Sequence, residues 1–218
     1  MAITRTEMGS TTRERLLETA LAALGEDGSE ALDAARLAAR AGVTEDELVA
    51  EFTDLDACLD AAYEQFVSRL GDAVRNGCER GRARAGGTPA EDWSAGVRGG
   101  LEALLAELTA SPARAVALVR AYPALGAPRR LRYEAFVADL PPLLTEGRKF
   151  AAASGAALPG EVELLAVGAA EAIVFDAVES GRAAALAEMA PAVLFSLLVP
   201  FIGASAAAAE MEKVGGGP

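Results

Sequence analysis

Helix-start signals recur along this chain, and no segment of useful length alternates as a strand would. The capping-box pattern T-x-x-E occurs at Thr44–Glu47 and again at Thr88–Glu91, each time before an apolar-periodic run. Hydrophobic residues make up 52% of the chain, mostly as Ala and Leu, whereas aromatic residues reach only 5%. Such a composition favours helices over strands. The sequence therefore predicts an all-α fold of about nine helices.

Capping and helix-breaking residues predict where these helices lie. Gly25 and Gly28 are expected to end the first helix and Gly42 the second, because glycine is favoured just beyond helix C-termini. The pair Pro141-Pro142 is expected to kink or split the seventh helix. The expected helices span about 12–24, 34–41, 45–52, 55–84, 89–108, 112–122, 128–153 and 159–181, and the last runs from about 186 to beyond 201.

The fourth helix is long enough to be shared by two domains. It follows Asp54 and runs to about Arg84, where the sequence AGGTP breaks the chain. We expect a three-helix N-terminal domain at 1–53, a larger helical domain at 54–210, and a flexible tail at 211–218 that contains GGGP.

Residue usage excludes several functional classes. The chain has no histidine, which removes His-based catalytic triads and most zinc or iron ligand sets. No other constellation points to catalysis, so neither an enzyme nor a cofactor is expected. Cys58 and Cys78 would lie about 30 Å apart on one helix at 1.5 Å per residue, too far for a disulfide. The N-terminus lacks an apolar signal segment, so the expected location is the cytoplasm.

The longest apolar run, at 192–209, has two interpretations. Its length approaches that of a membrane span. However, it contains Pro200 and Gly203, and small residues make up much of it. We therefore favour a core or interface helix and expect no membrane partner.

The residues at 37–52, LAARAGVTEDELVAEF, have the order and spacing of a helix-turn-helix. Leu37 and Ala38 allow two helices to approach closely, Gly42 suits the turn, and Leu48 and Phe52 anchor the second helix. With TRERLLETALAALGEDG at 12–28 and DLDACLDAAYEQF at 54–66, this segment resembles the TetR/AcrR family of transcriptional regulators. The stretch at 171–203 resembles that family's C-terminal dimerisation helices, and the stretch at 114–136 resembles its actinobacterial members.

The resemblance implies a homodimer that binds double-stranded DNA at a palindromic operator. A small-molecule effector, mostly apolar, would bind in the larger domain and release the DNA. Dimerisation accords with the physics of recognition, because two reading helices held one helical turn apart discriminate better than one.

The expected DNA-reading helix is unusually acidic. Where the family usually has a tyrosine and a basic residue, this chain has Val49 and Glu45. Residues 1–60 hold five basic and 14 acidic side chains, and the chain as a whole has a net charge of −12. Acids at a helix start stabilise the helix dipole but remove phosphate contacts. The residues expected to face DNA are Arg5, Arg13, Arg36, Arg40, Thr44, Glu45, Glu47 and Val49.

Two further groups of residues follow from the resemblance. Large apolar residues of the middle helices are the candidate effector-binding group; they are Trp93, Leu105, Val119, Tyr122, Tyr133, Phe136 and Phe175. A tryptophan or phenylalanine at helical spacing is more often ordinary core than ligand wall. Tyr122 and Tyr133 are better candidates, because a buried phenol needs a polar partner, which a ligand can provide. Arg129, Arg130 and Arg132 either attract an anion or form solvated surface. Residues of the last two helices are the candidate dimer interface, namely Ala169, Ala172, Ala192, Val193, Ser196 and Leu197.

Three functional hypotheses remain. The leading one is a ligand-responsive repressor. The alternative is a diverged protein that keeps the fold and dimer as a sensor or interaction partner, with weakened or lost operator binding. An enzyme ranks third, because no catalytic constellation supports it.

Overall fold

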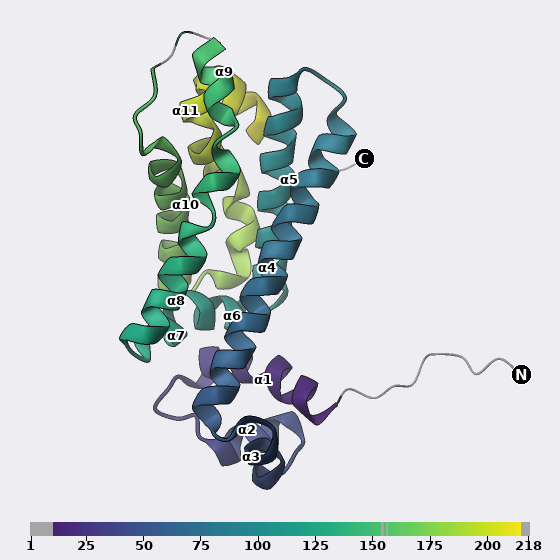
Figure 1. Cartoon of the computed structure of the whole chain (residues 1–218), viewed down its shortest axis with the longest axis vertical. Coiled ribbons are helices and arrows are strands. Elements are labelled where there is room, and N and C mark those ends of the chain that lie inside the picture. The colour runs from purple at the N-terminus through teal and green to yellow at the C-terminus, as the bar shows by residue number, and fades with distance from the viewer. Residues whose placement is uncertain (1–10, 154, 156, 215–218) are drawn as a thin grey trace, which may run out of the picture.

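A computed structural model describes residues 11–153, 155 and 157–214, and none of these residues lies in a β-strand. As Figure 1 shows, α1–α3 form one end of the molecule, and the long α4 runs from them alongside α5. The elements are α1 (Thr12–Asp27), α2 (Ala34–Ala41), α3 (Glu45–Phe52), α4 (Leu55–Ala85), α5 (Pro89–Ala110), α6 (Pro112–Val116), the π-helix η1 (Ala117–Ala121), α7 (Tyr122–Ala124), α8 (Ala127–Ala138), the 3-10 helix η2 (Pro141–Leu144), α9 (Gly147–Ala153), α10 (Val162–Glu179), the 3-10 helix η3 (Ala183–Met189) and α11 (Ala190–Met211).

The all-α prediction is confirmed, and local capping explains where several helices begin. Thr11, Thr44 and Thr88 each accept a hydrogen bond from the backbone of a glutamate three residues later, which completes a capping box. Asp33 and Asp54 cap α2 and α4 in the same way. These starts are fixed by neighbouring residues alone, and the sequence predicts them well.

Several boundaries differ from the sequence prediction. Gly25 does not end α1, which continues to Asp27 and is capped by Gly28. A Cβ atom on Gly25 would lie 1.8 Å from the backbone oxygen of Ala113, so this glycine lets α1 approach α6 closely. The eighth predicted helix begins at Val162, three residues later than Pro159. The ninth, expected from about Leu186, begins as α11 at Ala190, after the 3-10 helix η3.

The segment predicted at 128–153 is divided into three pieces. α8 ends at Ala138, the turn η2 begins at Pro141, and α9 begins at Gly147. The two prolines provide the physical reason, since each lacks a backbone N–H and crowds the preceding turn.

α4 and α5 pack against each other at glycine and alanine positions. A Cβ atom on Gly77 would lie 2.3 Å from the backbone oxygen of Gly99, and one on Gly81 would lie 2.1 Å from that of Ala95. The two backbones are therefore in direct contact between the C-terminal half of α4 and the first half of α5. Cys58 and Cys78 both lie on α4 and are free thiols.

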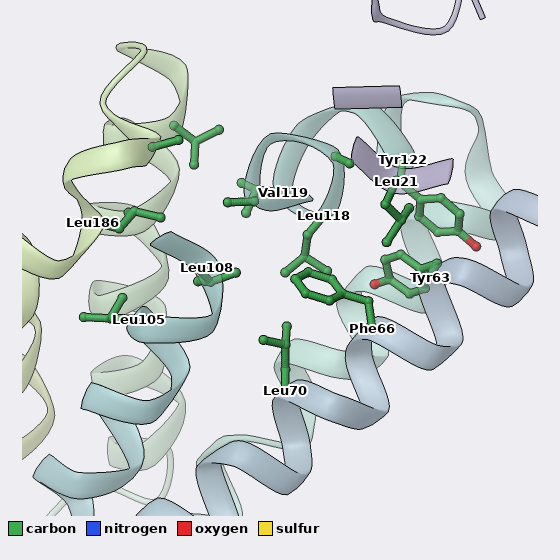
Figure 2. Packing of buried hydrophobic residues seen from close by; sticks show 14 of the residues in the cluster. Leu21, Tyr63, Phe66, Leu70, Leu105, Leu108, Leu118, Val119, Tyr122 and Leu186 are labelled. Atoms are coloured by element: carbon green, nitrogen blue, oxygen red, sulfur yellow. The ribbon is translucent and has the colours of Figure 1, made fainter. Parts of the chain in front are cut away.

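A single buried cluster runs from the N-terminal helices into the larger bundle. Figure 2 shows Leu21 of α1 beside Tyr63 and Phe66 of α4, close to Leu118 of η1. The ring of Tyr63 stacks on that of Tyr122, with centroids 3.9 Å apart. The N-terminal helices are thus connected to the bundle by apolar packing as well as by α4.

The C-terminal segment Ala183–Met211 is long and apolar enough to cross a membrane by length and composition. In the structure it consists of η3 and α11, and Gly203 interrupts the helical backbone with a φ of 78°. Leu194, Leu198 and Phe201 of this segment are buried in the bundle. Its packing is that of a bundle helix. Of the tail expected at 211–218, residues 215–218 lie outside the described residues.

Candidate effector cavity and DNA-facing surface

The α2–turn–α3 unit has the geometry of a helix-turn-helix. Gly42 takes the left-handed conformation after α2, with a φ of 66°, and this reverses the chain toward Thr44. Leu37 and Leu48 are fully buried between the helices, and Phe52 is nearly so. α3 is therefore held firmly, with its remaining side chains directed outward.

The outward face of α3 is acidic, and Glu47 has a structural role. Its carboxylate accepts hydrogen bonds from the backbone N–H of Thr44 at 2.7 Å and from the Thr44 hydroxyl at 3.0 Å. The backbone bond, followed by the hydroxyl bond, lowers the pKa of Glu47. Glu45 is exposed, and Val49 is 51% exposed in the middle of the face. Both Thr44 and Glu47 are therefore occupied by capping.

The arginines expected to contact DNA are bonded within the domain. Arg40 forms ion pairs with Glu26 and, at 2.8 Å, with Asp27, which also pairs with Arg36 at 3.2 Å. The Arg13 guanidinium donates to the backbone oxygen of Glu51 at 3.2 Å. It also lies 4.2 Å from the centroid of the Phe52 ring. Arg5 lies outside the described residues.

An apolar cavity of about 140 Å³ lies in the larger bundle. Its wall is formed by residues of α4, α5, η1, α8, η2, α10 and α11 and by Leu140. Of the residues predicted to bind effector, this wall includes Leu105, Val119, Tyr133 and Phe136. Most of the wall is aliphatic, so the cavity suits an apolar molecule.

The other three predicted effector residues do not line this cavity. Trp93 is packed between Phe150 and Phe201, with ring centroids 5.6 and 5.5 Å away. Tyr122 is fully buried, and its hydroxyl donates to Asp60 of α4. Phe175 is 47% exposed on the outside of α10. Size and aromaticity do not distinguish a cavity wall from a tightly packed core.

Part of the cavity wall was not predicted from the sequence. Val167, Ala170, Glu171 and Val174 line the cavity from one face of α10. Their spacing of three and four residues is the signal that could have identified them together.

Next to the cavity, α8 is bonded to the N-terminal part of α4. Asp60 on α4 accepts from the Tyr122 hydroxyl at 3.1 Å and from Arg129 Nε at 2.7 Å. Its other carboxylate oxygen lies 2.9 Å from Arg132 Nη1, and Arg129 also pairs with Asp56 at 3.0 Å. We call Asp60, Tyr122, Arg129 and Arg132 the α4–α8 latch. The polar partner expected for Tyr122 is thus Asp60.

The latch lies beside residues of the cavity wall along the chain. Tyr133 lines the cavity and directly follows Arg132, while Val119 lines it three residues before Tyr122. Arg130, the third arginine of the cluster, pairs with Glu134 at 3.7 Å on the surface of α8. A change in the cavity wall therefore has a short route to α4 just beyond the helix-turn-helix.

The α4–α8 latch is expected to make the free energy of unfolding depend on pH through Asp60. Burial raises the pKa of Asp60, but hydrogen bonds and charges from Arg129, Tyr122 and Arg132 outweigh it and hold the pKa below its usual value. A lowered folded-state pKa stabilises the fold above the unfolded pKa, near 4, and this stabilisation is lost as pH falls through the folded value. We expect Asp60→Asn to lower the free energy of unfolding at pH 7 by about 1 kcal/mol.

The measurement for this prediction is urea unfolding between pH 7 and pH 3. The variant should lose less stability than the unmodified chain on acidification, since it lacks the titrating group. Asp72→Asn is the control, because Asp72 pairs with Arg75 at 62% side-chain exposure on both sides. If the free energy of unfolding depends on pH equally in the Asp60 variant and the unmodified chain, the latch does not stabilise the fold.

The candidate dimer residues divide between the surface and the interior. Ala169, Ala172 and Ala192 are exposed, whereas Ser196 and Leu197 are partly buried. Val193 is 1% exposed and lines the cavity together with Leu197, so a dimer contact for Val193 does not fit its position. On α10 the exposed alanines lie among exposed large apolar residues, which are Leu164, Leu165 and Phe175. α10 therefore presents an apolar outer face.

Six solved structures with the same arrangement of helices, two of them FadR proteins and four described as TetR-family or TetR-like, are transcriptional regulators. The fatty acid degradation regulator FadR from Bacillus halodurans superposes with a TM-score of 0.68 at 16% identity, over 88% of this chain and 97% of its own. FadR from Bacillus subtilis, in complex with stearoyl-CoA, gives 0.62 at 18% identity, over 85% and 97%. The chain has the fold of the TetR-family regulators.

A third similar structure with the TetR fold is a putative TetR-family regulator from Rhodococcus sp., with a TM-score of 0.62 at 18% identity, over 87% of this chain and 98% of its own. No protein-family model matches the sequence, and no curated protein matches it. The similarity therefore lies in the fold. Among the residues that the structure describes, no group of three or more His, Cys, Asp or Glu side chains could hold a metal ion.

Proposed function

We propose that this chain is a ligand-responsive transcriptional regulator of the TetR family. As a homodimer in the cytoplasm it binds a palindromic operator as a repressor, and a small-molecule effector releases it. Residues 1–53 form the DNA-binding domain and residues 54–210 the effector and dimerisation domain. The observation that carries the proposal is the apolar cavity, whose wall residues Val119 and Tyr133 lie close along the chain to residues of the α4–α8 latch, which bonds to α4 near its start.

The latch supplies a mechanism for release. An effector that fills the cavity displaces Val119 and Tyr133, and with them the neighbouring Tyr122 and Arg132. Because both of these residues bond to Asp60, the displacement reaches α4 close to its start. α4 then changes the separation of the two α3 helices across the dimer. The effector must bind the released state more tightly, since only differential affinity shifts an equilibrium.

The outer face of α10 supports the dimer. Large exposed apolar side chains beside small residues allow two helices to approach closely and bury apolar area. Only 28% of the most apolar window of Ala183–Met211 is buried in the single chain. A second copy of the chain, packed on α10 and α11, would cover this surface.

The effector is a mostly apolar molecule. The wall is almost entirely aliphatic, and the Bacillus subtilis FadR structure, of similar fold, holds stearoyl-CoA. An aliphatic chain is therefore the simplest occupant that these walls accommodate.

A second function is favoured by one specific observation. All four basic residues at 11–68 are bonded inside the domain, including Arg15, which donates to the backbone oxygen of Gly42 at 2.9 Å. In this alternative the chain is a sensor or interaction protein that keeps the fold and dimer but has weak or no operator binding. Phosphate contacts supply most non-specific affinity, so basic residues that are already bonded to acids and backbone oxygens of their own domain weaken DNA binding.

DNA binding across salt concentrations separates the two functions. We expect a labelled duplex from the region upstream of the coding sequence to bind the dimer at 50 mM salt in a fluorescence anisotropy titration. The salt slope should be shallow, because few phosphate contacts are available. A scrambled duplex of the same length is the control. A folded dimer that binds neither duplex at low salt would favour the sensor over the repressor.

A further inference from the structure

The cavity wall contains one carboxylate. Of the described residues that line it, Glu171 on α10 is the only charged side chain. It lies in the stripe of Val167, Ala170 and Val174, where every other position is apolar. A carboxylate against an apolar wall is costly unless it is paired, so its presence in this stripe requires an explanation.

Among the described residues, Glu171 has one hydrogen-bond partner, and that partner is neutral. The Tyr133 hydroxyl donates to its Oε1 atom at 2.8 Å, and both residues line the cavity. None of the ion pairs among the described residues includes Glu171. An ionised carboxylate accepts about four hydrogen bonds, so most of its capacity is left for a ligand.

The other polar side chains of the wall are neutral. Burial raises the pKa of Tyr133, and its hydrogen bond to Glu171 raises it further, so the phenol stays protonated as a donor. Burial also raises the pKa of Cys78, which keeps this thiol protonated. Glu171 alone therefore sets the sign of the charge inside the cavity.

We propose that the effector is a cationic amphiphile, with an apolar body and a protonated amine that binds the Glu171 carboxylate. The apolar body fills the space against Leu105 and Phe136, and the ammonium group donates to the free lone pairs of Glu171. Hydrogen bonds between an ammonium and a carboxylate are stronger than neutral ones. A fatty acid would place a second negative charge beside Glu171 and is disfavoured. This inference rests on the proposed effector function of the cavity and adds the class of ligand.

Three probes with the same chain test the proposal, namely octylammonium, octanol and octanoate. Each is titrated by calorimetry at pH 7 and below its micellar concentration into the full chain. At this pH an alkylamine is protonated, as lysine is. We expect octylammonium to bind at least tenfold more tightly than octanol, and octanoate to bind more weakly than both.

Matched variants test whether Glu171 causes this order of affinities. Glu171→Gln should reduce the affinity for octylammonium about tenfold, leave that for octanol unchanged and increase that for octanoate. Tyr133→Phe removes the internal donor but keeps the carboxylate, so it should retain octylammonium binding. Glu179→Gln is the control, because Glu179 lies on the same helix and outside the cavity wall.

Each outcome supports or overturns the inference. If the three probes bind equally, or octanoate binds best, the assignment of a cationic ligand is wrong and the apolar effector cavity stands. If no probe binds, both the ligand class and the effector role of the cavity are wrong. The DNA titration is independent of both results. Should Glu171→Gln fail to fold, the ranking of the probes on the unmodified chain decides alone.

Discussion

Removing Glu26 and Asp27 as partners is expected to raise the affinity of this chain for DNA. In the double variant Glu26→Gln and Asp27→Asn, Arg36 and Arg40 lose their ion pairs. Both arginines lie on α2, and within the described residues only the hydrogen bond of Arg36 to the backbone oxygen of Ala31, at 3.3 Å, then holds either of them away from phosphates. Two added phosphate contacts should steepen the slope of log affinity against log salt by about two, and raise affinity at low salt roughly tenfold. Anisotropy titrations on a non-specific duplex from 50 to 200 mM salt measure both quantities.

The control is a variant with the same change in net charge far from α1–α3. Glu79→Gln with Glu188→Gln removes two exposed acids, one on the C-terminal half of α4 and one on η3. It tests whether net charge alone accounts for any gain. If both double variants have the slope of the unmodified chain, the face that carries Arg36 and Arg40 does not approach DNA, and the repressor interpretation is weakened.

Gly77→Ala is expected to destabilise the chain strongly. The added Cβ atom would lie 2.3 Å from the backbone oxygen of Gly99 and 2.9 Å from the Cβ atom of Ala103, so α4 and α5 must separate. Overpacking costs of this kind reach about 3 kcal/mol. The substitution also favours the helix by about 1 kcal/mol, which leaves a net loss of roughly 2 kcal/mol. Urea unfolding at pH 7 measures the change.

Gly71→Ala on the same helix is the matched control. The nearest atom to its added Cβ is Arg75 Nη1 at 3.3 Å, the end of a flexible and exposed side chain. This variant should be as stable as the unmodified chain or more stable, by up to about 1 kcal/mol. Similar behaviour of the two variants would mean that α4 and α5 do not pack through their backbones.

Local features of the fold could be predicted from the sequence. The capping residues Thr44, Thr88 and Asp33 begin helices because they bond to backbone only three residues away. Gly25 illustrates the limit. Its role depends on Ala113, which lies far along the chain. In the sequence alone, such a glycine is equally consistent with the end of a helix and with a close contact between two helices.

The site was less predictable because it depends on long-range packing. Tyr122 needed a polar partner, as expected, but the partner is Asp60, 62 residues earlier in the chain. The charge deficit of α3 was visible in the sequence. The ion pairs of Arg40 with Glu26 and Asp27 could not be predicted from the sequence, because these acids belong to a different helix, α1.

In the proposed mechanism, the state of the cavity controls DNA binding through α4. The most direct test of this mechanism is the affinity of the upstream duplex, measured by anisotropy with and without a saturating concentration of the tightest-binding octyl probe. We expect the probe to weaken DNA binding about 5- to 150-fold, the usual range of coupling between two sites. Asp60→Asn, which weakens the α4–α8 latch, should reduce that factor. Identical affinities with and without the probe, in a dimer shown to bind both ligands, would contradict the account.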